Sequence, residues 1–295
     1  MTIEIGRIGL WTSTFEGHPW QQAADAARQI EALGFPTVWI PEATGRDAFV
    51  HSTLLLSATT TLKVATGIAN VYARDAMTTA ASQKTLAEAF PDRFLLGLGV
   101  SSPALVEKVR QHDYGKPYTY MRQYLEAMDK AMFTSVAPAS DPGRVLAALG
   151  PKMLALSASH AGGAHPYLTP PEHTASAREI LGAGALLAPE QMVVLSTDPS
   201  AARDIARKAI SFYLRAPGYL ANLTRLGYGD EDWADWKAPS DRLVDAIVAW
   251  GSTDAVCGRI RAHLDAGADH VCIQVLTAGR GFPVSEWTEL AGALL

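Results

Sequence analysis

Short apolar runs alternate along the chain with longer stretches in which apolar residues recur at helical spacing. The runs predict eight strands, at residues 8–11, 37–40, 64–69, 94–100, 145–149, 163–165, 192–196 and 270–276. The intervening stretches predict helices at residues 19–33, 48–59, 76–89, 118–133, 151–160, 172–181, 199–214 and 253–266, with a closing helix at 283–294. Strands interleaved with helices indicate a parallel sheet.

Eight strand–helix units within 295 residues are typical of an α/β fold of the TIM (β/α)8 barrel type. An open doubly wound sheet is disfavoured because the glycine-rich phosphate motif does not follow the first strand. We expect a single domain over residues 1–295. The least regular stretch, residues 214–242, is predicted to be an excursion between the last two units that covers one barrel end or a neighbouring subunit.

Composition narrows the class of protein. Apolar residues make up 48% and charged residues 19% of the chain, which is typical of a soluble globular protein. The net charge of -5 and the lack of basic runs argue against nucleic-acid binding. No apolar window reaches about 18 residues and no signal-peptide pattern begins the sequence, so we expect no membrane span and a cytoplasmic location. Cys257 and Cys272 are expected to be buried thiols rather than a disulfide.

The predicted strand ends, where a barrel carries its active site, are mostly neutral. Their one obvious carboxylate is Glu42, and His165 is the one histidine at a strand end. We therefore expect no metal site, no carboxylate pair for glycoside hydrolysis and no serine nucleophile, since no nucleophile elbow is present. A broad apolar mouth with glycine-rich edges instead suits a flat aromatic cofactor.

Two glycine-containing edges would serve such a cofactor. "AALGPKM" (residues 147–153) ends a strand and opens a helix, whose N-terminal N–H groups would bind phosphate. Ordinary helix capping explains the same residues equally well. In "FLLGLGVSS" (residues 94–102) alternating glycines would let a ring approach the backbone, or would permit tight packing against a helix.

The stretch "LKVATGIANVYARDAMTTAASQKTLAEAFPDRFLLGLGVS" (residues 62–101), with "GFPTVWIPE" before it and "AALGPKMLALSASHAGGAHPY" after it, resembles the bacterial luciferase-like superfamily. Within it the chain is most similar to oxidoreductases that use the deazaflavin coenzyme F420. The resemblance covers nearly the whole chain and implies a luciferase-like barrel. It implies F420 as cofactor, with FMN as the alternative.

The resemblance also implies roles for individual residues. A non-proline cis peptide at Gly67–Ile68 would lie behind the deazaflavin ring, and Asn70 would face the ring unless it only forms a turn. Glu42 would hydrogen-bond the ring or side chain of the cofactor. The remaining implied cofactor-binding residues are Gly99, Val100 and Ser101 after strand four, and Gly150, Pro151 and Lys152 at the phosphate turn.

One departure from the family concerns the proton donor. Many relatives carry a histidine after the acidic residue at Glu42, whereas this chain has Ala43, so no catalytic residue is assigned. Five residues are candidates to line an aromatic-friendly substrate pocket, although they would equally pack beneath loops: Trp11, Phe15, Tyr72, His165 and Tyr167.

These observations predict an oxidoreductase that moves a hydride between F420 and a small organic substrate, by reduction of an activated C=C, C=N or C=O bond or by the reverse reaction. The alternatives are an FMN-dependent luciferase-like monooxygenase and a cofactor-binding subunit without catalysis. The resemblance further implies a possible homodimer formed through the early helices.

Overall fold

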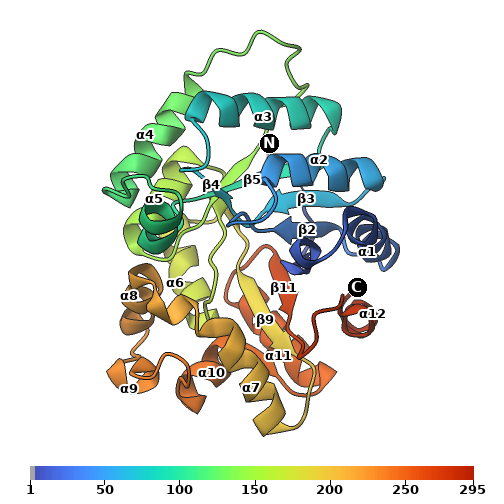
Figure 1. Ribbon diagram of the computed structural model, residues 1–295, viewed down its shortest axis with the longest axis vertical. Coiled ribbons are helices and arrows are strands. Elements are labelled where there is room, and N and C mark those ends of the chain that lie inside the picture. Colours follow the sequence, from blue (N-terminus) through green and yellow to red (C-terminus); the bar gives the residue numbers. More distant parts are fainter. Residues whose placement is uncertain (1–3) are drawn as a thin grey trace.

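The computed structural model describes residues 4–295 as a parallel sheet curled into a barrel, with helices around it (Figure 1). Its strands are β1 (Ile8–Trp11), β2 (Thr37–Ile40), β3 (Lys63–Thr66), β4 (Ala69–Asn70), β5 (Phe94–Gly99), β6 (Arg144–Leu146), β7 (Gly163–Ala164), β8 (Leu186–Leu187), β9 (Glu190–Val194), β10 (Val248–Trp250) and β11 (Val271–Val275). All strand pairs are parallel, as βα alternation requires.

The helices follow the strands in sequence. They are α1 (Trp20–Ala32), α2 (Ala48–Ala58), α3 (Ala76–Ala89), α4 (Pro117–Asp129), α5 (Pro151–His160), α6 (Pro171–Leu181), α7 (Pro199–Ile210), α8 (Pro217–Arg225), α9 (Asp230–Trp233), α10 (Asp241–Ile247), α11 (Thr253–Asp265) and α12 (Val284–Leu294). Two 3-10 turns, η1 (Thr14–Gly17) and η3 (Tyr213–Arg215), and a π-helical turn, η2 (Ala104–Val109), complete the set. Several helices begin at an Asp or Ser whose side chain accepts an N-terminal backbone N–H: Asp47, Asp75, Asp198, Ser240 and Ser252.

The barrel closes through the consecutive strands β8 and β9, which together we call the β8–β9 segment. On one edge of this segment β8 pairs with β7, where Gly163 lies opposite Leu186. On its other edge it pairs with β11, where Cys272 lies opposite Glu190, and β11 in turn pairs with β1. The short strand β10 pairs with the C-terminal residues of β9, Met192–Val194. The predicted TIM-barrel class is therefore confirmed.

Each of the eight predicted strands is present; the bounds of β1 and β2 are as predicted, and the ends of the other six are shifted. The predicted strand at 64–69 is divided into β3 and β4 by residues 67 and 68. The chain also forms β8 and β10, which were not predicted. Both are only two or three residues long, and such short segments carry no readable periodicity.

Alternate strand residues divide between two apolar layers. Val38 and Val64 pack with helix residues such as Leu55 in the layer between the strands and the helices. Trp39 and Ala65 belong to a second cluster that fills the barrel. This alternation is the period-2 pattern expected of barrel strands.

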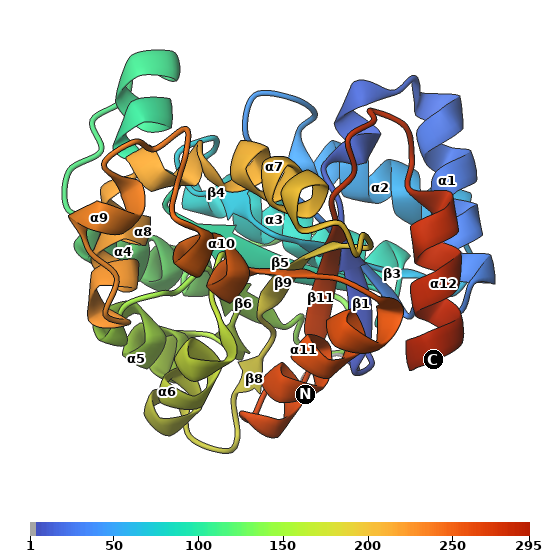
Figure 2. The same cartoon turned by 90° about the horizontal axis from the view of Figure 1, so that it is seen from below.

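The excursion between the last two units forms η3, α8 and α9, drawn in orange at the lower left of Figure 1 and on the left of Figure 2. Its aromatic residues, among them Tyr213, Tyr219, Trp233 and Trp236, pack against the barrel-filling cluster. The excursion therefore covers one end of the barrel, as predicted. Within residues 4–295 no helix is both long enough and apolar enough to cross a membrane.

Candidate active site

A bulge separates β3 from β4 at the mouth of the barrel. The Gly67–Ile68 peptide bond is cis and does not involve proline, which confirms the predicted position. Neighbouring strands fix the bulge: the Gly67 N–H donates to Ile40 O at 2.7 Å, and the Glu42 N–H donates to Ile68 O at 3.2 Å. The Trp11 indole donates to Gly67 O at 3.0 Å. The bulge is therefore held from both β1 and β2.

The side chain of Ile68 lies over the glycines of β5. A Cβ on Gly99 would stand 2.5 Å from Ile68 Cδ1 and 3.2 Å from the Cβ of Ala147. The side chain of Ile68 thus occupies the space that a side chain at position 99 would need, so the bulge requires glycine at this position. Ile68 itself is partly exposed and presents an apolar surface to the mouth. Val100 and Ser101, which directly follow β5, are also partly exposed.

Glu42 follows β2 and is 8% exposed. Its carboxylate accepts hydrogen bonds from Ala48 N at 3.1 Å and from Asn70 N at 2.7 Å. Two further hydrogen bonds come from the guanidinium of Arg74. Four hydrogen bonds match the acceptor capacity of a carboxylate. In the structure Glu42 therefore positions Asn70 and the bulge, rather than presenting the free oxygen expected for a direct bond to a cofactor.

Asn70 forms the local turn that the sequence allowed, and the structure leaves its side-chain N–H donor free. Its Oδ1 accepts from Tyr72 N at 2.9 Å, which is the hydrogen bond of a local turn. Its Nδ2 has no hydrogen-bond partner in the described chain, although the residue is only 1% exposed. A buried amide without a partner is costly, so Nδ2 is a candidate donor to a ligand.

The N-terminus of α5 lies farther along the same rim. Gly150 is its N-cap and offers no capping side chain, while Pro151 and the exposed Lys152 form its first turn. Arg225, from α8, places Nη2 2.9 Å from where a Cβ on Gly150 would be. Its Nη1 donates to Ala221 O at 2.9 Å. A guanidinium and a helix N-terminus side by side favour an anionic group.

Three of the five predicted pocket residues gather under the bulge. Trp11 packs on Tyr167 with ring centroids 5.3 Å apart. His165 stacks on Trp39 inside the barrel and is 1% exposed. Its Nδ1 donates to Ala188 O at 2.7 Å, and its Nε2 has no partner among residues 4–295. Burial lowers the pKa of His165 to about 4, so the ring is neutral at physiological pH.

The other two predicted pocket residues, Phe15 and Tyr72, lie in the layer between strands and helices. Phe15 is fully buried and contacts His51 and Phe282. Tyr72 stacks on Tyr120 with centroids 4.5 Å apart. The structure does not bring them into one pocket with Trp11, which packs with Tyr167 in the other apolar cluster.

Sequence reasoning missed a polar group inside the barrel. Glu190 begins β9 and is 1% exposed, and burial raises the pKa of its carboxyl to about 8. Nearby, Tyr167 Oη lies 2.9 Å from Tyr213 Oη and donates to Gln274 Oε1 at 2.8 Å. A charged residue at the start of an otherwise apolar strand was the one available signal for Glu190.

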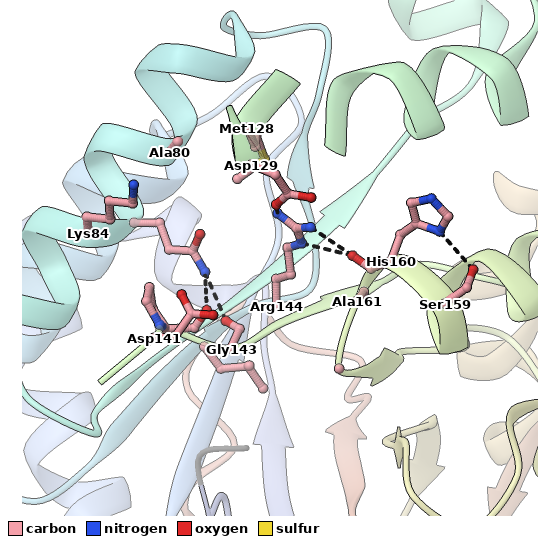
Figure 3. Close-up of a pocket in the computed structure, with 14 residues that line it drawn as sticks. Ala80, Lys84, Met128, Asp129, Asp141, Gly143, Arg144, Ser159, His160 and Ala161 are labelled. Atoms are coloured by element: carbon pink, nitrogen blue, oxygen red, sulfur yellow. Dashed lines mark hydrogen bonds and ion pairs between the residues drawn. The ribbon is translucent and has the colours of Figure 1, made fainter. Parts of the chain in front are cut away.

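A cavity of about 570 Å³ opens at the opposite end of the barrel, where β5 and β6 begin (Figure 3). Two of its charged residues, Arg144 and Asp129, form an ion pair. Arg144 contacts Asp129 at 2.8 Å and donates to His160 O at 2.8 Å, as the dashed lines in Figure 3 mark for the latter. No cluster of three or more potential metal ligands is found in the described part of the chain.

Residues 6–270 match a family model described as luciferase-like monooxygenase. A putative coenzyme F420-dependent oxidoreductase of Mycobacterium tuberculosis is 29% identical over 142 residues, which is 48% of this chain and 41% of the relative. Among solved structures, an F420-dependent secondary alcohol dehydrogenase superposes with a TM-score of 0.80 at 14% identity, over 100% of this chain and 98% of the other.

The FMN-bound oxygenating constituent of 3,6-diketocamphane monooxygenase from Pseudomonas putida superposes with a TM-score of 0.68 at 15% identity, over 96% of each chain. Proteins that use a deazaflavin and proteins that use a flavin therefore share this fold. The family model covers most of the sequence, from before β1 to the start of β11. The chain belongs to the luciferase-like monooxygenase family.

Proposed function

We propose that the protein is an F420-dependent oxidoreductase that acts on a small organic substrate with an activated C=C, C=N or C=O bond, or on the corresponding reduced compound. The observation that carries the proposal is the row of features along the mouth. An apolar platform at Ile68, a free amide donor at Asn70 and a cationic, uncapped helix N-terminus at Gly150 follow one another.

These features fit a flat ring with a long anionic side chain. Ile68 and the bulge would back the ring, and the orphaned Nδ2 of Asn70 would donate to a polar atom of the ring. Arg225 and the N-terminus of α5 would hold a phosphate. When bound, F420 supplies a carbon that gives or accepts a hydride. The protein contributes binding, orientation and the exclusion of water.

Sequence similarity also supports F420, because the mycobacterial relative is named as a putative coenzyme F420-dependent oxidoreductase. The main alternative is an FMN-dependent monooxygenase, which the family description and the FMN-bound neighbour keep open. The two cofactors differ chemically: flavin reacts readily with oxygen, whereas deazaflavin reacts poorly.

Cofactor binding decides between these two functions. The purified protein is titrated into F420, whose fluorescence is quenched on binding, and in parallel into FMN. We expect micromolar affinity for F420 and weak binding of FMN. Arg225→Gln is expected to weaken F420 binding about tenfold, since it removes a charge-assisted hydrogen bond to the anionic side chain. Micromolar binding of FMN with none of F420 would overturn the proposal.

Turnover then separates an enzyme from a binding subunit. Reduced F420 is mixed with 2-cyclohexen-1-one as a C=C probe and with acetone as a C=O probe, and its oxidation is followed by absorbance under nitrogen. Oxidation that needs the protein and a probe is expected. Oxidation that needs oxygen instead of a probe would favour the monooxygenase. Tight binding of F420 without oxidation by any acceptor would favour a non-catalytic subunit.

A further inference from the structure

Arg110 ends the π-helical turn η2 and is a cation without an acidic partner. Its Nη2 donates to Ala43 O at 3.0 Å, which is the one hydrogen bond of this side chain among residues 4–295. Its Nε is buried and has no partner in that part of the chain. Arg110 forms no ion pair with a described acidic residue, and the acids closest in sequence, Glu107 and Asp113, are both exposed.

The guanidinium of Arg110 has therefore lost part of its hydration without gaining a counter-charge. Burying part of a cation is unfavourable unless hydrogen bonds or an anion compensate for it. The group is still reachable, because Nη1 has no partner among residues 4–295 and remains open to solvent. Two Nη groups can bind both oxygens of a carboxylate at once. This guanidinium is thus suited to bind an anion that the described chain does not itself supply.

Contacts between neighbouring strand ends place Arg110 beside the apolar platform. Ala43 follows β2 and η2 follows β5, whereas β3 lies between these two strands in the sheet. The hydrogen bond from Arg110 to Ala43 O therefore bridges the end of β3, next to Ile68. The residue before Ala43 is bonded to the platform directly, since the Glu42 N–H donates to Ile68 O at 3.2 Å.

The other cations of the rim are either already paired or lie at its phosphate end. Arg74 forms ion pairs with two carboxylates. Arg225 stands at Gly150, which follows β6, and β6 pairs with β5 on the edge away from β3. Arg110 contacts the segment after β2, on the opposite side of the platform. A cofactor whose phosphate is held at Gly150 would leave this side of the mouth to the substrate.

We propose that Arg110 is the specificity-determining residue of the site, and that the substrate is a small organic acid whose carboxylate binds this guanidinium. The inference rests on the proposed function and adds the charge of the substrate to it. The reducible bond would lie over the apolar platform at Ile68, while the carboxylate reaches toward the end of β2. Arg110 binds and orients the substrate, and takes no part in proton or hydride transfer.

The first experiment compares two ligands that differ in charge. The full chain is loaded with oxidised F420, which carries no hydride, so an enone binds without being reduced. Dissociation constants of 3-oxocyclohex-1-ene-1-carboxylate and of its methyl ester are measured by saturation-transfer NMR. We expect the carboxylate to bind about tenfold or more tightly than the ester. The preference should shrink at about 0.5 M salt, because a partly exposed ion pair is screened.

The second experiment assigns that preference to Arg110. Arg110→Gln should bind the acid and the ester equally, whereas Arg110→Lys keeps the charge and should retain part of the preference. Lys108→Gln removes an exposed cation from the same turn and is the matched control, with the full preference expected. Affinity for F420 should stay within about twofold of the wild type in all three variants. Circular dichroism verifies that each variant is folded.

Three results would refute the role of Arg110. They are equal wild-type affinity for the acid and the ester, no binding of the acid at millimolar concentration, and a preference that persists in Arg110→Gln. A tenfold loss of F420 affinity in Arg110→Gln would also contradict it, because Arg110 would then bind the cofactor. The comparison of acid with ester in the wild type does not depend on the stability of any variant.

The outcomes separate this inference from the proposed function. Binding of F420 and turnover of 2-cyclohexen-1-one, without a preference for the carboxylate, would refute the acidic substrate and leave the oxidoreductase assignment intact. Failure of the wild type to bind F420 would refute the oxidoreductase assignment, and this inference would fall with it.

Discussion

Two buried glutamates in the same barrel, Glu42 and Glu190, have opposite surroundings. Glu42 follows β2 and accepts four hydrogen bonds, two of them from Arg74. Glu190 begins β9, accepts one long hydrogen bond from Leu168 N and leaves Oε1 free. Neither side chain is more than 8% exposed. Burial is thus nearly the same, and only the supply of donors differs.

The difference shows what each carboxyl group can do. A buried carboxylate with a cation and three or more donors has its charge balanced and acts as a fixed structural point. A buried carboxyl with one donor is more stable as the neutral acid, so it retains a proton that it can give away. Residue type and burial are therefore not enough to separate a charged structural carboxylate from a neutral carboxyl group.

The largest expected effect tests the ion pair between Glu42 and Arg74. Arg74→Met leaves Glu42 buried without its cation, and this should lower the free energy of unfolding by about 3–5 kcal/mol. Urea denaturation followed by circular dichroism measures the loss. Arg122→Met removes a half-exposed i,i+4 pair with Glu126 and is the control, with a loss under about 0.5 kcal/mol. A loss at Arg74 as small as the control would show that the pair is not needed.

The next effect tests the Glu190 side through pH. The pKa of Glu190 is raised from 4.5 to about 8, so between these values the folded protein binds a proton that the unfolded chain has lost. The stabilising effect of this proton is complete below about pH 4.5 and is lost as the pH rises toward 8. Wild-type stability should therefore fall with rising pH relative to Glu190→Gln, at up to about 1.4 kcal/mol per pH unit. Parallel pH curves for the two proteins would mean that Glu190 titrates normally.

A smaller effect concerns the free donor on the Glu42 side. Asn70→Asp keeps an oxygen to accept from Tyr72 N but replaces the orphaned N–H donor by an acceptor. We expect F420 affinity, measured by fluorescence quenching, to fall about tenfold, or about 1.4 kcal/mol. Unchanged affinity in a folded variant would remove Asn70 from the cofactor site and leave it a turn-forming residue.

The smallest effect is expected at the hydroxyl pair of Tyr167 and Tyr213. Tyr213→Phe deletes one hydrogen bond, to Tyr167, from a residue that is only partly buried. The free energy of unfolding should fall by about 0.5–1.5 kcal/mol in urea denaturation. A much larger loss would mean that the hydroxyl pair mainly holds the excursion on the barrel. The groups around Glu190 would then have a structural role, as those around Glu42 do.

Local pattern determined much of the fold. The eight strands and most helices follow from apolar periodicity and capping residues, which depend on neighbours within a few residues. The resemblance located the bulge at Gly67–Ile68 to a single bond, and the structure confirms it. The strand ends also placed Glu42, Asn70 and Gly150 at the mouth, because βα alternation puts the carboxyl ends of parallel strands on one rim.

Other features were decided only by the tertiary structure. Tyr167 meets Tyr213 and Gln274 across 46 and 107 residues of sequence, and Arg225 reaches Gly150 from α8. Such contacts depend on the pairing of the β8–β9 segment with β7 and β11, and on how the excursion covers the mouth. The different donor supplies of Glu42 and Glu190 have the same origin. A sequence specifies the residue at each position, but the groups that surround a buried carboxyl come from distant segments that meet only when the barrel closes.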